Sequence, residues 1–177
     1  ASTGIAATHL GGLTIHAWAG IGIARAASDM DIQVMASNKR VLKRFARTDV
    51  LIIDEISMLD ADRLDLVDRV ARLARGSFEP FGGMQVVCCG DFFQLPPIAK
   101  KGEPPPRFAY HADAWKNMQM RVCYLHEQYR QGDDEFTQIL NAIRNAAVDD
   151  AMVARLRARI AIALPQGRIT KLYSHSA

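Results

Sequence analysis

Two short apolar runs and the helical pattern between them dominate the first half of the chain. Residues 49–54 read D-V-L-I-I-D, an apolar run without alternation that is typical of a parallel strand covered on both faces. Residues 84–89 form a second such run, broken only by Gln85. Between the two runs, apolar residues recur at helical spacing over 60–75, with Asp60 as the expected N-cap. Strand, helix and strand in succession predict a βαβ unit with a right-handed crossover.

The second half of the chain shows the same alternation. A short apolar run predicts a third strand over 122–125, and apolar residues at helical spacing predict a helix over 133–146. A shorter helix from 149 to about 162 and a last strand over 169–173 complete the pattern. Alternating strands and helices are typical of an α/β fold with a largely parallel sheet. In such folds the functional residues lie at the carboxyl ends of the strands.

Composition and charge narrow the class of protein without naming a partner. The chain has 177 residues, 49% hydrophobic and 23% charged, which fits one globular domain, alone or with a fragment of another, and excludes disordered and fibrous classes. No apolar run approaches the ~18 residues of a membrane helix, and the start of the chain lacks signal-peptide features. We therefore expect an intracellular protein that does not act at a membrane. The net charge of +3 permits an anionic partner but does not indicate one.

Both ends of the chain look cut, because it opens without Met and stops directly after a strand-like run. No G-x-x-x-x-G-K-[ST] motif occurs, so no loop of the chain is expected to cradle the β- and γ-phosphates of a nucleotide. The segment alone is therefore expected to bind ATP poorly. The five histidines and three cysteines show no metal-ligand spacing, so a structural zinc site is not expected.

The first predicted strand ends in two acidic residues. Asp54 and Glu55 have the form of a Walker B element, in which the Asp holds Mg²⁺, usually through its waters, and the Glu orients or deprotonates the attacking water. An Asp-Glu pair also follows apolar strands by chance in many α/β proteins. The pair alone therefore leaves a catalytic and a structural interpretation open.

Two further polar residues follow the other predicted strands. Gln94 lies in the turn G-D-F-F-Q-L-P-P over 90–97, where a neutral amide can hydrogen-bond a γ-phosphate. The structural alternative is a loop Gln that caps its own backbone. Arg130 follows the third predicted strand and could stabilise charge on a transferred phosphoryl group. The alternative for Arg130 is a surface salt bridge.

Other charged and aromatic residues have simpler interpretations. Five Lys and Arg residues within 39–47 fit a DNA-facing stripe on a helix, but a solvated helix face is the favoured interpretation. Apolar neighbours favour core packing for Phe92. Trp18, Phe92 and Phe93 could each stack on bases, and Trp18 stays open between that role and core packing.

Together, these segments resemble the Pif (petite integration frequency) family of DNA helicases, in the RecD-like branch of helicase superfamily one. The resemblance covers nearly the whole chain. The matching segments are the DNA-contacting motif that follows the family's P-loop helix (2–7 and 11–22), motif II (54–58), the family signature segment (55–75), motif III with its lead-in (80–83 and 90–97) and the motif IV region (125–131 and 136–144). The resemblance implies a RecA-like P-loop NTPase fold of three layers, here truncated at its N-terminus.

The resemblance also implies roles in ATP hydrolysis for individual residues. Asp54 would bind Mg²⁺, and Glu55 would activate the attacking water. Gln94 would sense the γ-phosphate of ATP, and Arg130 would act as the arginine finger. The implied cofactors are therefore ATP and Mg²⁺.

For the larger protein, the resemblance implies a helicase that moves 5′ to 3′ on single-stranded DNA, with Thr3 and His16 in contact with the phosphates of that strand. Residues 1–162 would form most of the first motor domain without its P-loop strand and helix, and residues 163–177 would lead to the second RecA-like domain. Because ATP binds between the two domains in this family, the segment alone should not unwind DNA.

Finer implications concern the DNA structure and the cell. The resemblance implies action on DNA junctions or G-quadruplexes in genome maintenance, including repair, recombination, replication and telomeres. It also implies the nucleus or mitochondrion for a eukaryotic member and the cytoplasm for a bacterial one.

Two other classes of function are alternatives. In a metal-dependent nuclease, Asp54, Glu55 and Asp91 would hold two Mg²⁺ ions. That interpretation leaves Gln94 and Arg130 without a role. A non-catalytic module that binds single strands is the second alternative, and salt-dependent binding without nucleotide dependence would be its sign.

Overall fold

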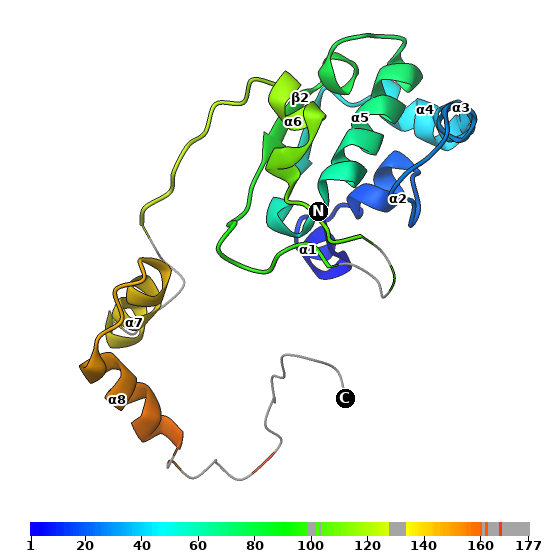
Figure 1. Ribbon diagram of the computed structural model, residues 1–177. Coiled ribbons are helices and arrows are strands. Elements are labelled where there is room, and N and C mark those ends of the chain that lie inside the picture. Colours follow the sequence, from blue (N-terminus) through cyan, green and yellow to red (C-terminus); the bar gives the residue numbers. More distant parts are fainter. Residues whose placement is uncertain (99–101, 103, 128–133, 161, 163–166, 168–177) are drawn as a thin grey trace. The chain divides into compact units, whose positions relative to one another are not determined.

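The computed structural model in Figure 1 describes residues 1–98, 102, 104–127, 134–160, 162 and 167 of the chain. These residues belong to two compact units, one up to Cys123 and one from Tyr124 onward. Within the described ranges, we find no helix that is both long and apolar enough to cross a membrane. The last strand predicted from the sequence, over 169–173, lies outside the described residues, and the predicted division after residue 162 stays a prediction.

A parallel strand pair and the helix between its strands form the centre of the first unit. β1 (Val50–Ile53) and β2 (Gln85–Cys88) pair in parallel, in a register that sets Ile53 opposite Cys88. α5 (Ala61–Arg75) connects the two strands. The strands and the helix expected from the apolar pattern are therefore confirmed, and the carboxyl ends of the two strands are level with each other.

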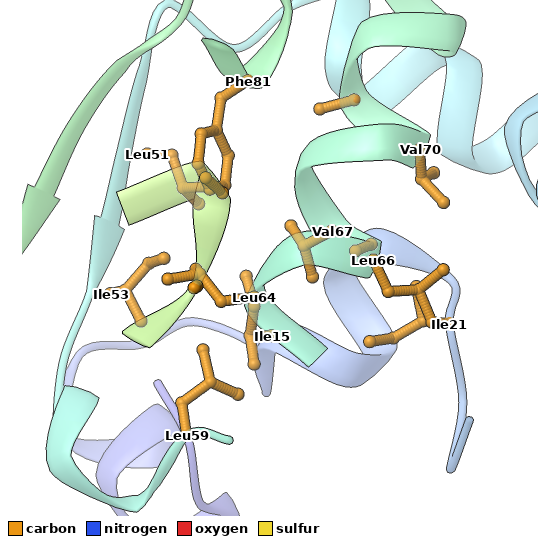
Figure 2. Packing of buried hydrophobic residues seen from close by; sticks show 14 of the residues in the cluster. Ile15, Ile21, Leu51, Ile53, Leu59, Leu64, Leu66, Val67, Val70 and Phe81 are labelled. Carbon is orange, nitrogen blue, oxygen red and sulfur yellow. The ribbon is translucent and has the colours of Figure 1, made fainter. Parts of the chain in front are cut away.

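One stripe of α5 is buried against the strand pair. Leu64 and Val67 are fully buried, and they belong to one hydrophobic cluster with Leu51 and Ile53 of β1 (Figure 2). The spacing of three residues keeps the α5 side chains on one face of the helix. Burial of each such side chain stabilises the fold by about 1.5–3 kcal/mol, so this contact holds α5 and the strand ends in place.

The opposite face of β1 differs from the sequence expectation. The apolar run predicted a strand covered on both faces, but Val50 is 47% exposed and Ile52 is 54% exposed, whereas Leu51 and Ile53 are buried. The reason is that α5 and its neighbours cover only one side of the strand pair among the described residues. The expectation of two covered faces is thus wrong for the part of the chain that the structure describes.

Short helices make up most of the rest of the first unit. Three of them pack against α5: α3 (Asp29–Ser37), α4 (Lys39–Ala46) and α6 (Asp113–Asn117). Gly20 ends α2 in a left-handed conformation, with φ 73°. A Cβ at this position would lie 2.6 Å from Cγ2 of Val41, so glycine permits the close approach of α2 to α4. These elements are α1 (Gly4–His9), α2 (Ile15–Ala19), α3 (Asp29–Ser37), α4 (Lys39–Ala46), η1 (Ile56–Met58), η2 (Pro80–Gly83), η3 (Ala109–His111) and α6 (Asp113–Asn117).

The positively charged helix within 39–47 is α4, and its structure agrees with a solvated face. Its apolar residues Val41 and Phe45 are buried. Arg44 donates hydrogen bonds to the carbonyl oxygens of Ala17 and Trp18, so this cation fixes the end of α2. The other cations of this segment are exposed: Lys39, Arg40, Lys43 and Arg47.

Two of the three aromatic residues considered for base stacking pack inside the first unit, whereas Phe93 is 78% exposed. The ring centroid of Trp18 lies 4.5 Å from that of Phe45, which resolves the open choice in favour of core packing. Phe92 makes edge-to-face contacts with Phe108, Tyr110 and Trp115, with centroid distances of 5.7, 5.0 and 6.0 Å. The core packing expected for Phe92 is confirmed.

Asp60 and Arg25 tie a distant loop to the start of α5. The Asp60 carboxylate caps α5 by accepting from the backbone N–H of Asp62, as predicted, and it also accepts from the backbone N–H of Arg107. Arg25 donates to the same carboxylate through Nε and Nη2, at 3.1 and 3.0 Å, and to the carbonyl oxygen of Pro104. Asp60 is only 1% exposed, and these bonds satisfy its buried charge.

The later part of the chain is helical, and one predicted strand is absent from it. α7 (Asp134–Arg144) and α8 (Asp150–Ile160) confirm the two helices expected there. Residues 122–125 form no strand, and the Leu125 side chain is 95% exposed. The prediction of a third strand is wrong for a physical reason: an apolar run becomes a strand only where a neighbouring strand accepts its hydrogen bonds, and no described strand lies beside it.

Candidate functional site

The predicted acidic pair occupies a constrained turn at the carboxyl end of β1. Glu55 adopts a left-handed backbone conformation, with φ 54° and ψ 46°. Its backbone N–H donates to Oδ1 of Asp54 at 2.9 Å, so the first carboxylate stabilises the turn that presents the second. Left-handed backbone is costly for residues other than glycine, and such residues are concentrated at functional sites.

Ser2 holds this turn from the other side. Its backbone N–H donates to the carbonyl oxygen of Asp54 at 3.1 Å, and its hydroxyl donates to the carbonyl oxygen of Glu55 at 2.6 Å. The backbone N–H of Ile56 donates to the carbonyl oxygen of Cys89 at 3.0 Å. The polar backbone groups of the turn are therefore bonded to two other segments, which fixes the backbone that carries both carboxylates.

Gly90 brings the end of β2 against the same turn. A Cβ on Gly90 would lie 2.9 Å from both Cγ2 and the backbone nitrogen of Ile56, so no other residue fits without displacement of the backbone. The parallel register and this contact bring the segment after Ile53 and the segment after Cys88 to one sheet edge. The sequence expectation that Asp54, Glu55 and the 90–97 turn share an edge is consistent with this geometry.

The Gln94 side chain forms a hydrogen bond with Asp91, a neighbour in the same turn. Its side-chain Nε2 donates to Oδ2 of Asp91 at 3.1 Å, and Oδ1 of Asp91 accepts from the backbone N–H of Phe93 at 3.1 Å. Gln94 is otherwise exposed to solvent. Because the Gln94 amide bonds within its own turn, this contact resembles the structural alternative more than an amide that is free to bind a γ-phosphate. The partner differs from the one expected, since it is a carboxylate and not the backbone.

The nuclease alternative needs three clustered carboxylates. Asp91 uses both of its oxygens inside its own turn. Among the described residues, no group of three or more His, Cys, Asp or Glu side chains is placed to hold a metal ion. The arrangement that the nuclease interpretation requires of Asp54, Glu55 and Asp91 is thus not formed in the described part of the chain.

Thr3 and His16 line one pocket of about 210 Å³ next to this turn. Thr3 is the N-cap of α1, and its hydroxyl oxygen accepts from the backbone N–H of Ala6 at 3.3 Å. Ser2 lines the pocket as well, so it links the pocket to Asp54 and Glu55. The full lining is Ser2, Thr3, His16, Met58, Leu59, Arg63 and Ile98.

Burial and nearby positive charge favour the neutral form of His16. Burial lowers the pKa of the imidazole below its usual value, and the charge of Arg63 lowers it further. A neutral imidazole can donate one hydrogen bond to a ligand in the pocket.

Sequence reasoning missed Arg63 and Ser2. Arg63 lies in the first turn of α5, where it looked like one of many charged residues on an exposed helix face, and no sequence signal distinguished it. Ser2 was noted only within the segment that resembles a DNA-contacting motif. Arg130, the predicted arginine finger, lies outside the described residues.

Comparison with protein families identifies the group to which this geometry belongs. Residues 1–153 match the family model described as PIF1-like helicase. The chain belongs to the PIF1-like helicase family. The match includes the turn at the end of β1, the pocket and the 90–97 turn, and it confirms the resemblance noted in the sequence.

Relatives of this PIF1-like chain are considerably longer. It is 47% identical over 186 aligned residues to the ATP-dependent DNA helicase Pif1 of Psychrobacter sp., covering 99% of the chain and 28% of that protein. It is 40% identical to the ATP-dependent DNA helicase PIF1 of Saccharomyces cerevisiae, covering 98% of the chain and 20% of that protein. The chain thus spans about a quarter of the length of these relatives.

Solved PIF1-like structures have the same fold. The crystal structure of Pif1 helicase from Candida albicans superposes with a TM-score of 0.82 and 40% identity, covering 95% of this chain and 38% of that one. Pif1 helicase from Bacteroides in complex with ADP-AlF3 and ssDNA superposes with a TM-score of 0.75 and 35% identity, covering 88% and 38%. The predicted α/β, RecA-like fold class is therefore confirmed.

Proposed function

We propose that this PIF1-like chain contributes the water-activating edge and part of the DNA-binding surface of an ATP-dependent DNA helicase. The observation that carries the proposal is the meeting of the two strand ends, which brings the Asp54–Glu55 turn and the Gln94 turn to one edge. The relatives named above are ATP-dependent DNA helicases, and one solved relative is described with ADP-AlF3 and ssDNA.

Asp54 fits the role of a Mg²⁺ ligand. One of its oxygens, Oδ1, accepts from the backbone N–H of Glu55, and the described residues provide no hydrogen bond to the other oxygen. Mg²⁺ commonly keeps several waters and takes one or two carboxylates together with substrate phosphates, so a single fixed carboxylate suits it. When bound here, Mg²⁺ with ATP would supply the phosphoryl group and neutralise its developing charge.

The remaining residues of the edge would act on water and on the γ-phosphate. Glu55 would accept the proton of the attacking water, and its constrained backbone would keep the carboxylate aimed at that water. Gln94 would exchange its bond to Asp91 for one to the γ-phosphate, which makes the turn responsive to nucleotide. Arg130 would stabilise the charge of the transferred group from outside the described residues.

The DNA-facing part of the proposal rests on the pocket. Thr3 and His16 both line it, and both carry hydrogen-bond donors suited to a phosphate.

The proposal also covers the larger protein. Residues 1–162 would belong to the first motor domain, and 163–177 would lead to the second RecA-like domain, which would close the nucleotide site. Movement from 5′ to 3′, action on junctions or G-quadruplexes, roles in repair, recombination, replication and telomeres, and an intracellular location belong to this same proposal for the larger protein.

ATP hydrolysis by the full-length protein tests the proposal. We expect turnover in the presence of single-stranded DNA, with a loss of at least about 100-fold in Glu55→Gln and of about 10³-fold or more in Arg130→Ala. Glu79→Gln is the matched control, because Glu79 is exposed and its side chain makes no capping bond, and it should leave turnover unchanged.

The outcome also separates the helicase from a binding module. Undiminished turnover in Glu55→Gln would contradict the assigned water-activating role. No turnover by a folded wild-type protein, together with DNA binding that ignores nucleotide, would favour the non-catalytic single-strand-binding function instead.

A further inference from the structure

A positively charged side chain in the pocket next to Thr3 and His16 has no partner in the described part of the chain. Arg63 projects from the first turn of α5 and lines the pocket. Its Nε is buried, and among the described residues it has neither a hydrogen-bond acceptor nor a carboxylate within salt-bridge distance. A buried donor without an acceptor is unfavourable, so a ligand that supplies one would be stabilised there.

The nearest carboxylates on α5 are already used by other residues. Asp60 binds Arg25, and Asp62 binds both Arg25 and Arg107. The Asp65 carboxylate accepts from the backbone N–H of Ala114 at 2.7 Å. Arg63 therefore forms no ion pair with the carboxylates at the start of its own helix.

The other polar groups of the pocket are also able to donate. The Thr3 oxygen accepts from Ala6, which leaves its hydroxyl proton for a ligand, and His16 provides an imidazole N–H. Three convergent donors favour an anion with several acceptor oxygens. The remaining wall is apolar and suits the sugar that adjoins a phosphate in a nucleic acid: Met58, Leu59 and Ile98.

We propose that Arg63 binds a backbone phosphate of single-stranded DNA in this pocket, together with Thr3 and His16. The inference rests on the proposed function and adds a residue to its DNA-binding surface. Guanidinium and phosphate form charge-assisted, often bidentate hydrogen bonds, which a neutral side chain of similar length cannot replace. Arg63 would thus contribute affinity and position the strand without reading its sequence.

The salt dependence of strand binding tests this role in the full-length protein. An oligothymidylate labelled with a fluorophore would be titrated at several salt concentrations. We expect Arg63→Gln to weaken binding roughly tenfold and to reduce the slope of log K against log salt by about 0.7, the value for one lost phosphate contact on a single strand. Arg63→Lys should keep most of the slope, because it keeps the charge.

Two controls guard the interpretation. Arg40→Gln removes an exposed cation from α4, which lies outside the pocket, and should leave affinity and slope unchanged. Thermal melting of each variant checks that the fold is intact. If Arg63→Gln lowers the melting temperature, the comparison of wild type with the folded Arg63→Lys and with modified strands still tests the contact.

Modified strands identify the phosphate as the bound group. A single uncharged methylphosphonate linkage would be moved along the oligonucleotide. At one position it should weaken binding to the wild type but not to Arg63→Gln, since the contact is already absent in that variant. If no position behaves in this way, or if the Arg63→Gln slope equals that of the wild type, the role of Arg63 is overturned while the helicase proposal stands. A wild-type protein that does not bind single strands would overturn both.

Discussion

At the residue scale, Glu55 combines an unfavourable backbone conformation with the proposed role of activating the attacking water. Its left-handed conformation is held by two hydrogen bonds: its backbone N–H donates to Oδ1 of Asp54, and its carbonyl oxygen accepts from the Ser2 hydroxyl. The sequence predicted the carboxylate through the apolar run that precedes it. It did not predict the backbone conformation, because one of the bonds that hold it comes from Ser2, more than fifty residues away in the chain.

Replacing Glu55 by glycine should separate stability from activity. Glu55→Gly removes the Cβ that makes the left-handed conformation costly, so the free energy of unfolding should stay equal or rise by up to about 1 kcal/mol. ATP turnover by the full-length protein should be lost, because the variant lacks the carboxylate that we propose activates water. Chemical denaturation and an ATPase assay measure the two effects. Gln119→Gly, at an exposed residue with φ 48°, offers the same backbone relief and should leave turnover intact.

His16 should make the stability of the protein depend on pH. Burial lowers the pKa of its imidazole in the folded state, so the unfolded chain binds the proton more readily. The stabilising effect of the neutral ring is therefore complete above the unfolded pKa of about 6.5, and it is lost as the pH falls through the lower folded pKa. Urea denaturation between pH 5 and 8 should show this loss in the wild type and a smaller one in His16→Gln. An equal pH dependence in both proteins would contradict the assignment.

The pocket contains residues that the sequence predicted as DNA-contacting and one that it did not. Thr3 and His16 were predicted because their segments resemble a known DNA-contacting motif. Arg63 could not be predicted, since its position in the pocket depends on how the start of α5 packs beside α1 and α2, and local sequence does not specify that packing.

At the element scale, α5 organises the segments that follow it through its carboxylates. Asp60, Asp65 and Asp68 accept hydrogen bonds from the backbone N–H groups of Arg107, Ala114 and Phe81, respectively. Each bond fixes a different later segment onto one helix. α5 is thereby both the crossover between the strands and the support for three later segments of the chain.

Asp68 is the sharpest test of this supporting role. It is 6% exposed, accepts from the backbone N–H of Phe81 at 2.6 Å and pairs with Arg72 at 2.8 Å. Asp68→Ala leaves both groups without their acceptor and should lower the free energy of unfolding by about 2–4 kcal/mol in denaturant titrations. Asp113→Ala breaks only the exposed pair with Lys116 and should cost less than about 1 kcal/mol. Similar losses for both variants would mean that Asp68 is not a support.

The helices and strands differ in how well the apolar pattern predicted them. β1, α5, β2, α7 and α8 were predicted because each carries a periodic or continuous apolar pattern of sufficient length. Residues 122–125 carry a similar pattern and form no strand. A helix satisfies its own backbone, whereas a strand needs a partner that the local pattern cannot reveal.

At the scale of the whole molecule, the uncovered face of the strand pair indicates further packing in the full-length protein. Val50, Ile52 and Val87 expose apolar surface on this face. Parallel sheets are ordinarily covered on both faces. We therefore expect Ile52→Thr to cost the full-length protein about 1–2 kcal/mol but to change the 177-residue chain by less than about 0.5 kcal/mol. Thermal or chemical unfolding of both proteins measures the difference, and equal losses would contradict the expected cover.

The sheet edge that carries the Asp54–Glu55 and Gln94 turns shares segments of the chain with the pocket. Ser2 binds the turn of Asp54 and Glu55 and lines the pocket, and the chain that carries Gln94 continues to Ile98 in the pocket wall. A strand bound in the pocket and a nucleotide bound at the edge would thus act on the same two segments. Each ligand is expected to favour the arrangement that binds the other.

The rate of ATP hydrolysis by the full-length protein, with and without saturating single-stranded DNA, tests this central claim most directly. We expect DNA to raise the wild-type rate at least about tenfold, and we expect Gln94→Ala to lose most of that increase while still binding the strand. Leu95→Ala, an exposed neighbour in the same turn, should retain the increase. Equal rates with and without DNA in a folded, ATP-hydrolysing wild type would contradict the claim.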